Sequence, residues 1–263
     1  FTKGIMVGKS DGTYSSTRKF LPKTKITRDE AKKMMNRLKN KGKRFKLSYD
    51  GQVLRIINLP KNYKDYPYIL ASFPNSYYEK KMWYTKQRTK NDKTPAQTAK
   101  ILSDEDKDMI CAKIKKNVEL RLNVDYRKTF TSKWKSDLMN TYIDTNKQKS
   151  VNAYIKAAKA RKVVVSSGEV IVDPSSLWLR EYGTTCYARV YVKFRVKSGK
   201  IPSVKSKCQN EVIYGSYTGM KNLTSKKTVT FSDEIECDLS YTNGKLTSYG
   251  VDWGGDSIAN VNN

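Results

Sequence analysis

The spacing of apolar residues along this chain changes from a helical period to a strand period. Apolar positions recur at intervals of three and four over 27–38, 103–122 and 132–161, with a break near 144–148, and this spacing predicts amphipathic helices. Residues 185–196 alternate between apolar and polar side chains, which predicts a long antiparallel strand with one buried face. Short apolar runs predict further strands at 163–165, 170–172, 210–217, 227–231, 235–241 and 246–253.

This order of elements predicts an α+β fold. An N-terminal helical half-module and a helical or irregular middle are expected to precede a helix packed on a curved antiparallel sheet. Asn243-Gly244 between the last two predicted strands is a strong signal for a hairpin turn. The layout is loosely similar to cystatin-like and nuclear-transport-factor-like cones, a shape that hosts enzymes, binders and scaffolds alike.

The most specific spacing lies in the first forty residues. Asp11 and Gly12 belong to a predicted turn, because aspartate bonds nearby backbone amides and glycine tolerates positive φ. Thr27 is a predicted helix N-cap, and Glu30 three positions later completes a T-x-x-E capping box. The helix that follows is expected to present one apolar face, formed by Ala31, Met34, Met35 and Leu38.

The order G-I-x-x-G-x-x-D-G-x-[YF], a basic extended segment and I-T-R-[AD]-E-A-x-x-M resembles the second half of an S-layer homology domain. Such domains are helix–loop–helix units that bacteria export and use, usually in sets of three, to hold proteins on the cell wall. Asp29 departs from the family pattern, which usually has alanine there, and the resemblance covers residues 4–38 only. The matching residues are Gly4, Ile5, Gly8, Asp11, Gly12, Tyr14, Ile26, Thr27, Arg28, Glu30, Ala31 and Met35.

The resemblance implies a site for an anionic wall polymer. In the family, the arginine after the capping threonine contributes to binding the anionic secondary wall polysaccharide, and this role would fall on Arg28. The lysines nearby are expected to add electrostatic attraction, whereas the turn residues shape the groove. The expected polymer-binding residues are therefore Asp11, Gly12, Lys23, Lys25, Thr27, Arg28, Glu30 and Lys32.

The charge of the chain agrees with a polyanionic partner. The formal net charge is +27, and the excess of lysine and arginine lies almost entirely before residue 163. A net charge of this size attracts a wall polymer, an anionic lipid surface or a nucleic acid over a long range. Solubility alone explains the charge equally well. No run approaches the ~20 apolar residues of a membrane-spanning helix.

The residue inventory argues against catalysis. The chain has no histidine, which removes the commonest general base and zinc ligand. The four cysteines form no C-x-x-C pair, and those in strand-like runs fit a disulfide or buried free thiols equally well. Glu234, Glu236 and Asp238 share one face of a predicted strand, where a solvated sheet edge is expected rather than acid–base chemistry. We predict no catalytic residue, no metal site and no cofactor.

Three regions are expected. Residues 1–40 form the partial S-layer homology module, and residues 41–128 form a basic, aromatic-rich connector with a hairpin around Asp50-Gly51 and one helix. Residues 129–263 form the α+β domain. The whole is expected to be a non-catalytic, extracellular surface protein of a Gram-positive-type bacterium, without membrane insertion, that is associated with anionic wall polymer or peptidoglycan. The alternatives are a basic nucleic-acid-binding protein and a cone that binds or hydrolyses a small ligand.

Overall fold

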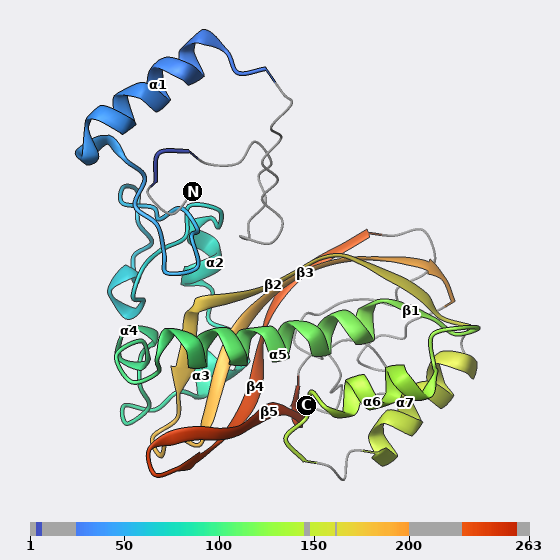
Figure 1. The fold of residues 1–263 in the computed structure, drawn as a ribbon. Helices are drawn as coiled ribbons and strands as arrows, with labels where there is room; N and C mark the ends of the chain where they lie inside the picture. The colour runs from blue at the N-terminus through green and yellow to red at the C-terminus, as the bar shows by residue number, and fades with distance from the viewer. Residues whose placement is uncertain (1–3, 7–24, 145–147, 161, 200–227, 257–263) are drawn as a thin grey trace. The chain divides into compact units, whose positions relative to one another are not determined.

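The fold is taken from a computed structural model, drawn in Figure 1, which describes residues 4–6, 25–144, 148–160, 162–199 and 228–256. The chain divides into two compact units, Phe1–Lys80 (unit 1) and Lys81–Asn263 (unit 2). This division lies after residue 80, whereas the regions expected from the sequence end at residues 40 and 128. The predicted strand over 210–217 lies outside the described residues.

Unit 2 is built on a five-stranded antiparallel sheet that curls into a half-barrel (Figure 1). Its strands follow the chain order, so each pairs with its sequence neighbour. The strands are β1 (Val124–Asp125), β2 (Val164–Leu179), β3 (Thr185–Ser198), β4 (Thr228–Thr242) and β5 (Lys245–Asp256). The α+β class predicted from the sequence is confirmed.

The strands are longer than the apolar runs that predicted them. The runs at 163–165 and 170–172 belong to the single strand β2, whose pairing with β3 shifts register near Gly168 and again between Asp173 and Trp178. Register shifts of this kind let a long strand bend with the curl of the sheet. The hairpin turn is confirmed: Asn243 and Gly244 have φ of 51° and 74° between β4 and β5, as a type I′ turn requires.

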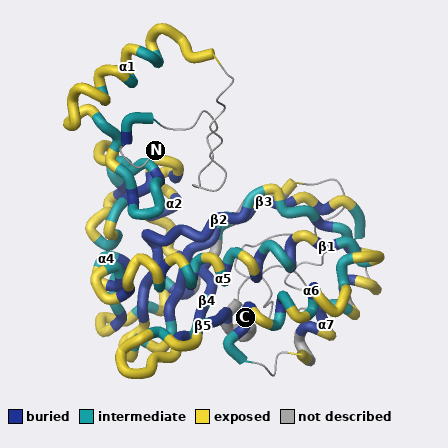
Figure 2. Tube along the Cα trace, in the orientation of Figure 1, coloured by how far each residue is buried: buried dark blue, intermediate teal, exposed yellow. Residues whose placement is uncertain are grey.

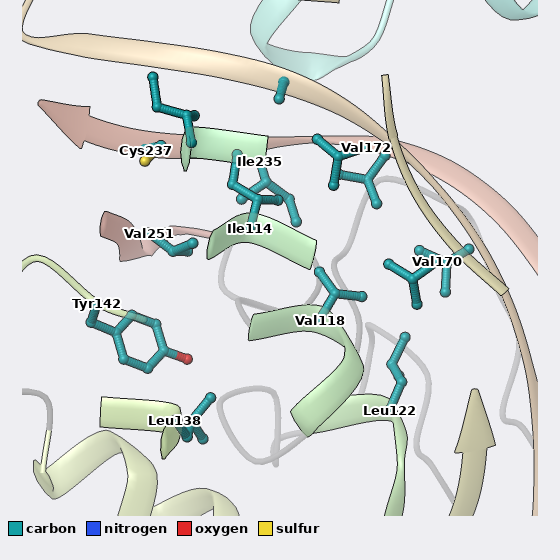
Figure 3. Packing of buried hydrophobic residues seen from close by; sticks show 14 of the residues in the cluster. Ile114, Val118, Leu122, Leu138, Tyr142, Val170, Val172, Ile235, Cys237 and Val251 are labelled. Atoms are coloured by element: carbon teal, nitrogen blue, oxygen red, sulfur yellow. The ribbon is translucent and has the colours of Figure 1, made fainter. Parts of the chain in front are cut away.

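Helix α5 (Asp104–Leu122) packs against the sheet, and its side chains form the centre of the core. Figure 3 shows Ile114, Val118 and Leu122 of this helix among side chains of the strands. Ser103 caps the helix as predicted. The shorter helices α6 (Ser132–Met139) and α7 (Gln148–Ala160) bury Trp134, Leu138, Val151, Tyr154 and Ala158 in the same core.

Both faces of β3 are buried over its first half, which the alternating pattern did not predict. Its apolar face packs into the core as expected, but Tyr187 and Arg189 on the opposite face are only 1% and 2% exposed. Tyr187 stacks on Trp178 of β2, with ring centroids 4.3 Å apart, and packs against Tyr84 of the short helix α3 (Trp83–Gln87). A second, smaller layer therefore covers this part of the sheet. The helix α4 (Pro95–Thr98) lies beside β2, where Thr98 Oγ1 accepts the Leu179 N–H at 3.0 Å.

Among its described residues, unit 1 contains the long helix α1 (Arg28–Lys39), the short helix α2 (Asn75–Glu79) and two single-turn 3₁₀ helices, η1 (Lys41–Lys43) and η2 (Tyr63–Asp65). The predicted hairpin is present as a bridge between Leu47 and Val53 around Gly51, whose φ is +82°. Phe73, Tyr77 and Tyr78 are buried together here with Ile69 and Leu70. Phe73 stacks on Tyr77 with ring centroids 4.0 Å apart, and the Tyr78 hydroxyl accepts the Leu70 N–H at 3.0 Å.

Candidate functional site

Helix α1 begins at the capping box predicted from the sequence. The Thr27 hydroxyl accepts the Glu30 N–H at 3.1 Å, and the Glu30 carboxylate accepts the Thr27 N–H at 2.7 Å. Asp29 and Glu30 also place negative charge on the first turn, where the helix dipole favours it. Thr27 and Glu30 therefore define where the helix starts and hold Arg28 in its first turn.

The other end of α1 is tied to the chain that follows it. The Arg44 guanidinium donates to the carbonyl oxygens of Arg37 and Leu38 at 3.0 and 3.3 Å, which satisfies two acceptors of the last turn. The Arg37 guanidinium lies over the Phe45 ring, 4.1 Å from its centroid. Phe45 also donates its N–H to the Gly4 carbonyl at 2.9 Å. These contacts fix the helix within unit 1 while its outer surface stays open.

The outer surface of α1 carries basic side chains with exposed apolar side chains between them. Figure 2 shows α1 as mostly exposed, and no residue of the helix is buried. The predicted apolar face is therefore largely uncovered, with Met35 and Leu38 51% and 52% exposed. A shallow hollow runs along the helix, and the side chains that line it are Arg28, Ala31, Lys32, Met35, Asn36 and Lys39.

The spacing of these residues explains how they share one face. Positions 28, 32, 35 and 39 are separated by three and four residues, so their side chains follow one another along the helix. A guanidinium binds a carboxylate or a phosphate through two parallel hydrogen bonds, whereas a lysine acts as a mobile point charge. Met35 and Ala31 offer an apolar floor between the cations. This combination suits a chain of anionic sugars, whose rings have apolar faces and whose substituents carry charge.

The structure separates the predicted site residues into two groups. Arg28, Lys25 and Lys32 are exposed on or beside the first turns of α1. Asp11, Gly12 and Lys23 lie outside the described residues, so their part in the site stays a prediction. Sequence reasoning had missed Asn36 and Lys39 as members of this face. Their spacing from Arg28 and Lys32 was the signal that could have found them.

A second polar cluster lies on the face of β3 and β4 that turns away from α5. The sequence predicted that this row of carboxylates lies on a solvated sheet edge. That prediction is wrong, because β4 pairs with β3 on one side and with β5 on the other. Glu234 as a whole residue is 2% exposed. It accepts hydrogen bonds from the N–H of Thr85, at 2.7 Å, and from its hydroxyl, and it lies 3.5 Å from the Arg189 guanidinium.

The remaining carboxylates of this row also have donors on β3. The Tyr187 hydroxyl donates to Glu236 at 3.0 Å, and burial, with the negative Glu236 beside it, raises the pKa of this phenol far above its usual range. Thr185 donates to Asp238 at 3.1 Å. Each carboxylate of the row thus joins β4 to a neighbouring segment. The row therefore links β4 to β3 through Glu236 and Asp238, and to Thr85 of the second layer through Glu234.

The described ranges contain neither a membrane-spanning helix nor a cluster of metal-binding side chains. Among these residues, no helix combines the length and apolarity that a membrane crossing requires. Nor do histidine, cysteine, aspartate or glutamate side chains in the described ranges gather in a group of three or more able to hold a metal ion.

The role of Thr27 gives a local prediction. Thr27→Ala removes the hydroxyl that accepts the Glu30 N–H, and loss of such a cap costs about 1 kcal/mol. Backbone amides of α1 are therefore expected to exchange with solvent about fivefold faster, measured by hydrogen–deuterium exchange on the full chain. Thr27→Ser keeps the acceptor and is the matched control. Equal protection in the alanine and serine variants would contradict the capping role.

The chain was compared with known proteins at three levels. No family model matches it, no curated protein matches it, and no solved structure matches it.

Proposed function

We propose that the protein is a non-catalytic, extracellular surface protein of a Gram-positive-type bacterium that binds anionic cell-wall polymer through helix α1. The observation that carries this proposal is the exposed face of α1, on which Arg28, Lys32 and Lys39 flank Ala31 and Met35. The resemblance of residues 4–38 to S-layer homology domains supports the same partner. Unit 2 is the domain carried by this attachment, and its role is interaction with other molecules at the surface.

The electrostatics of α1 support a polyanion as the partner. Five basic residues on or directly before α1 are exposed: Lys25, Arg28, Lys32, Lys33 and Lys39. The first turn of the helix carries two acidic residues, Asp29 and Glu30. Glu30, one of those two, is held by its capping hydrogen bond to Thr27. Cations gathered on and directly before one exposed helix attract a polymer with regularly spaced negative charges.

The packing of unit 2 supports an interaction domain rather than an enzyme. The sheet face toward α5 is filled by buried apolar side chains, including Ile110, Val190 and Ile235. On the opposite face, the row of Glu234, Glu236 and Asp238 is bonded to Thr85, Tyr187 and Thr185. The candidate carboxylates are thus used for cohesion of the fold.

The proposal is tested by sedimentation of the full chain with purified peptidoglycan that carries its anionic secondary polymer. The expected result is co-sedimentation that weakens steeply as salt rises from about 0.05 to about 0.5 M, because ions screen exposed charges. Peptidoglycan stripped of the polymer by acid extraction is the control, and retention should be lost with it. Equal retention on both wall preparations would overturn the polymer as the ligand.

A nucleic acid is the alternative polyanion, favoured by the net charge of +27 and by the aromatic residues but by no sequence motif. Duplex DNA and single-stranded DNA are added as competitors to the same assay. We expect the protein to stay bound to the polymer-bearing peptidoglycan when either DNA is present in mass excess. Release by DNA, together with tighter binding to DNA than to polymer at equal salt, would overturn the proposal in favour of nucleic-acid binding.

A further inference from the structure

Two cysteines of unit 2 stand directly opposite each other on neighbouring strands. Cys186 of β3 pairs in register with Cys237 of β4. Both are free thiols and both are 0% exposed. Their side chains point to the α5 face, since each belongs to the core cluster that α5 covers, and Figure 3 shows Cys237 there beside Ile235.

The strand register sets the distance between them. Two positions earlier on this ladder, Leu239 donates its N–H to the Thr184 carbonyl at 2.8 Å, so residues 184 and 239 form a hydrogen-bonded pair. Because such pairs alternate along antiparallel strands, Cys186 and Cys237 form the next one. Their Cα atoms are then about 5.5 Å apart, well inside the range of about 4.4–6.8 Å that a disulfide spans.

Both thiols lie in the same buried core cluster. The neighbouring Cys237 thiol and complete burial raise the pKa of Cys186 well above its usual value. Cys111 of α5 packs against the same core cluster but is only partly buried, and it belongs to a helix rather than to a facing strand. The register therefore favours Cys237 over Cys111 as the partner of Cys186.

We propose that Cys186 and Cys237 are a disulfide site that closes when the chain folds under oxidising conditions. A low-molecular-weight disulfide is the oxidant. One thiolate attacks it to form a mixed disulfide and releases one thiol, and the second cysteine attacks that intermediate and releases another. The two cysteines lose two electrons and two protons in total, and one disulfide becomes two thiols. Folding is the step at which this happens, because burial protects both thiols afterwards.

The bond would join the two strands at the middle of the sheet and enclose the intervening residues 187–236. A crosslink that closes a long loop restricts the unfolded chain and stabilises the fold. This inference does not rest on polymer binding. The wall assay and the thiol assay use different readouts, so either can fail alone.

The test is to refold the full, reduced chain with a mixture of oxidised and reduced glutathione. The four thiols of the sequence should fall to two when counted in denaturant. A protease digest should contain one disulfide-linked peptide pair, bearing Cys186 and Cys237, and the Tm of the product should drop when reductant is added. Four remaining thiols, or a dominant crosslink through Cys111 or Cys208, would overturn the proposal.

Matched variants separate the pair from the other cysteines. Cys111→Ser and Cys208→Ser should each still lose two thiols under the same conditions. The double variant Cys186→Ala, Cys237→Ala should keep both of its thiols. Should that double variant fail to fold, as circular dichroism would reveal, peptide mapping of the unaltered chain still decides the matter. Loss of two thiols in a folded double variant would contradict the assignment.

Discussion

Glu234→Ala is expected to lower the free energy of unfolding of unit 2 by about 3–5 kcal/mol. The Glu234 carboxylate and the Arg189 guanidinium are both almost fully buried, with side chains 3% and 2% exposed. Removing the carboxylate takes away a charge partner that lies 3.5 Å from the buried Arg189 guanidinium, and it also leaves the N–H and hydroxyl of Thr85 without the acceptor that they share. Disruption of a buried ion pair and loss of an acceptor for buried donors are among the few causes of losses this large.

The measurement is equilibrium unfolding of the full chain in denaturant, followed by the fluorescence of its tryptophans. Glu181→Ala is the matched control, because Glu181 is exposed and its carboxylate accepts a hydrogen bond from the exposed Asn91 side chain, so its loss should be below about 1 kcal/mol. Glu234→Gln keeps the shape and an acceptor, and it should fall between the two. A loss below about 1 kcal/mol for Glu234→Ala would show that the pair contributes little to the fold.

Gly250→Ala is expected to destabilise unit 2 by roughly 1–3 kcal/mol, the usual cost of forcing extra volume into a packed site. A Cβ at this position of β5 would lie 2.3 Å from the Ile143 nitrogen and 2.5 Å from the Tyr142 carbonyl carbon. These are backbone atoms, so no side chain can rotate away. The next residue, Val251, donates its N–H to the Thr141 carbonyl at 2.8 Å, and the added methyl group would force this contact apart.

Gly168→Ala in β2 is the control for this prediction. Its added Cβ would meet the Lys193 carbonyl oxygen at 3.5 Å, which is ordinary van der Waals contact. The two variants therefore differ in crowding and not in the chemistry of the change. The Tm of Gly250→Ala should fall by several degrees, and the Tm of Gly168→Ala should change much less. Equal shifts in Tm for the two variants would show that the backbone around Tyr142 and Ile143 moves away from β5 at little cost.

The elements of the fold could be predicted where local chemistry decides them. Thr27 and Glu30 satisfy each other's backbone donors, and Asn243-Gly244 adopts the positive φ of a hairpin turn, because both effects act within four residues. The alternation at 185–196 likewise identified the core face of β3. By contrast, two apolar runs became the one strand β2, because pairing with β3 carries the strand through its register shifts.

What the sequence could not provide were contacts made over long separations. The row of Glu234, Glu236 and Asp238 had the pattern of a solvated edge, but the strand order makes β4 internal. Thr85 reaches Glu234 from 149 residues away, and no local pattern signals such a partner. The exposure of the apolar face of α1 could not be predicted for the same reason. Apolar spacing predicts an amphipathic helix, whereas burial depends on what the rest of the chain places against it.

The polymer-binding account is tested most directly by the affinity of α1 variants for polymer-bearing peptidoglycan. The triple variant Lys25→Ala, Arg28→Ala, Lys32→Ala is compared with Lys156→Ala, Lys159→Ala, Arg195→Ala, which removes the same charge from exposed positions of unit 2. Circular dichroism and Tm confirm that both are folded. The account predicts at least a tenfold rise in Kd for the α1 variant and less than a threefold change for the control, since three lost contacts of ~0.5–1 kcal/mol each suffice for the former. Equal affinities of the two variants would contradict it.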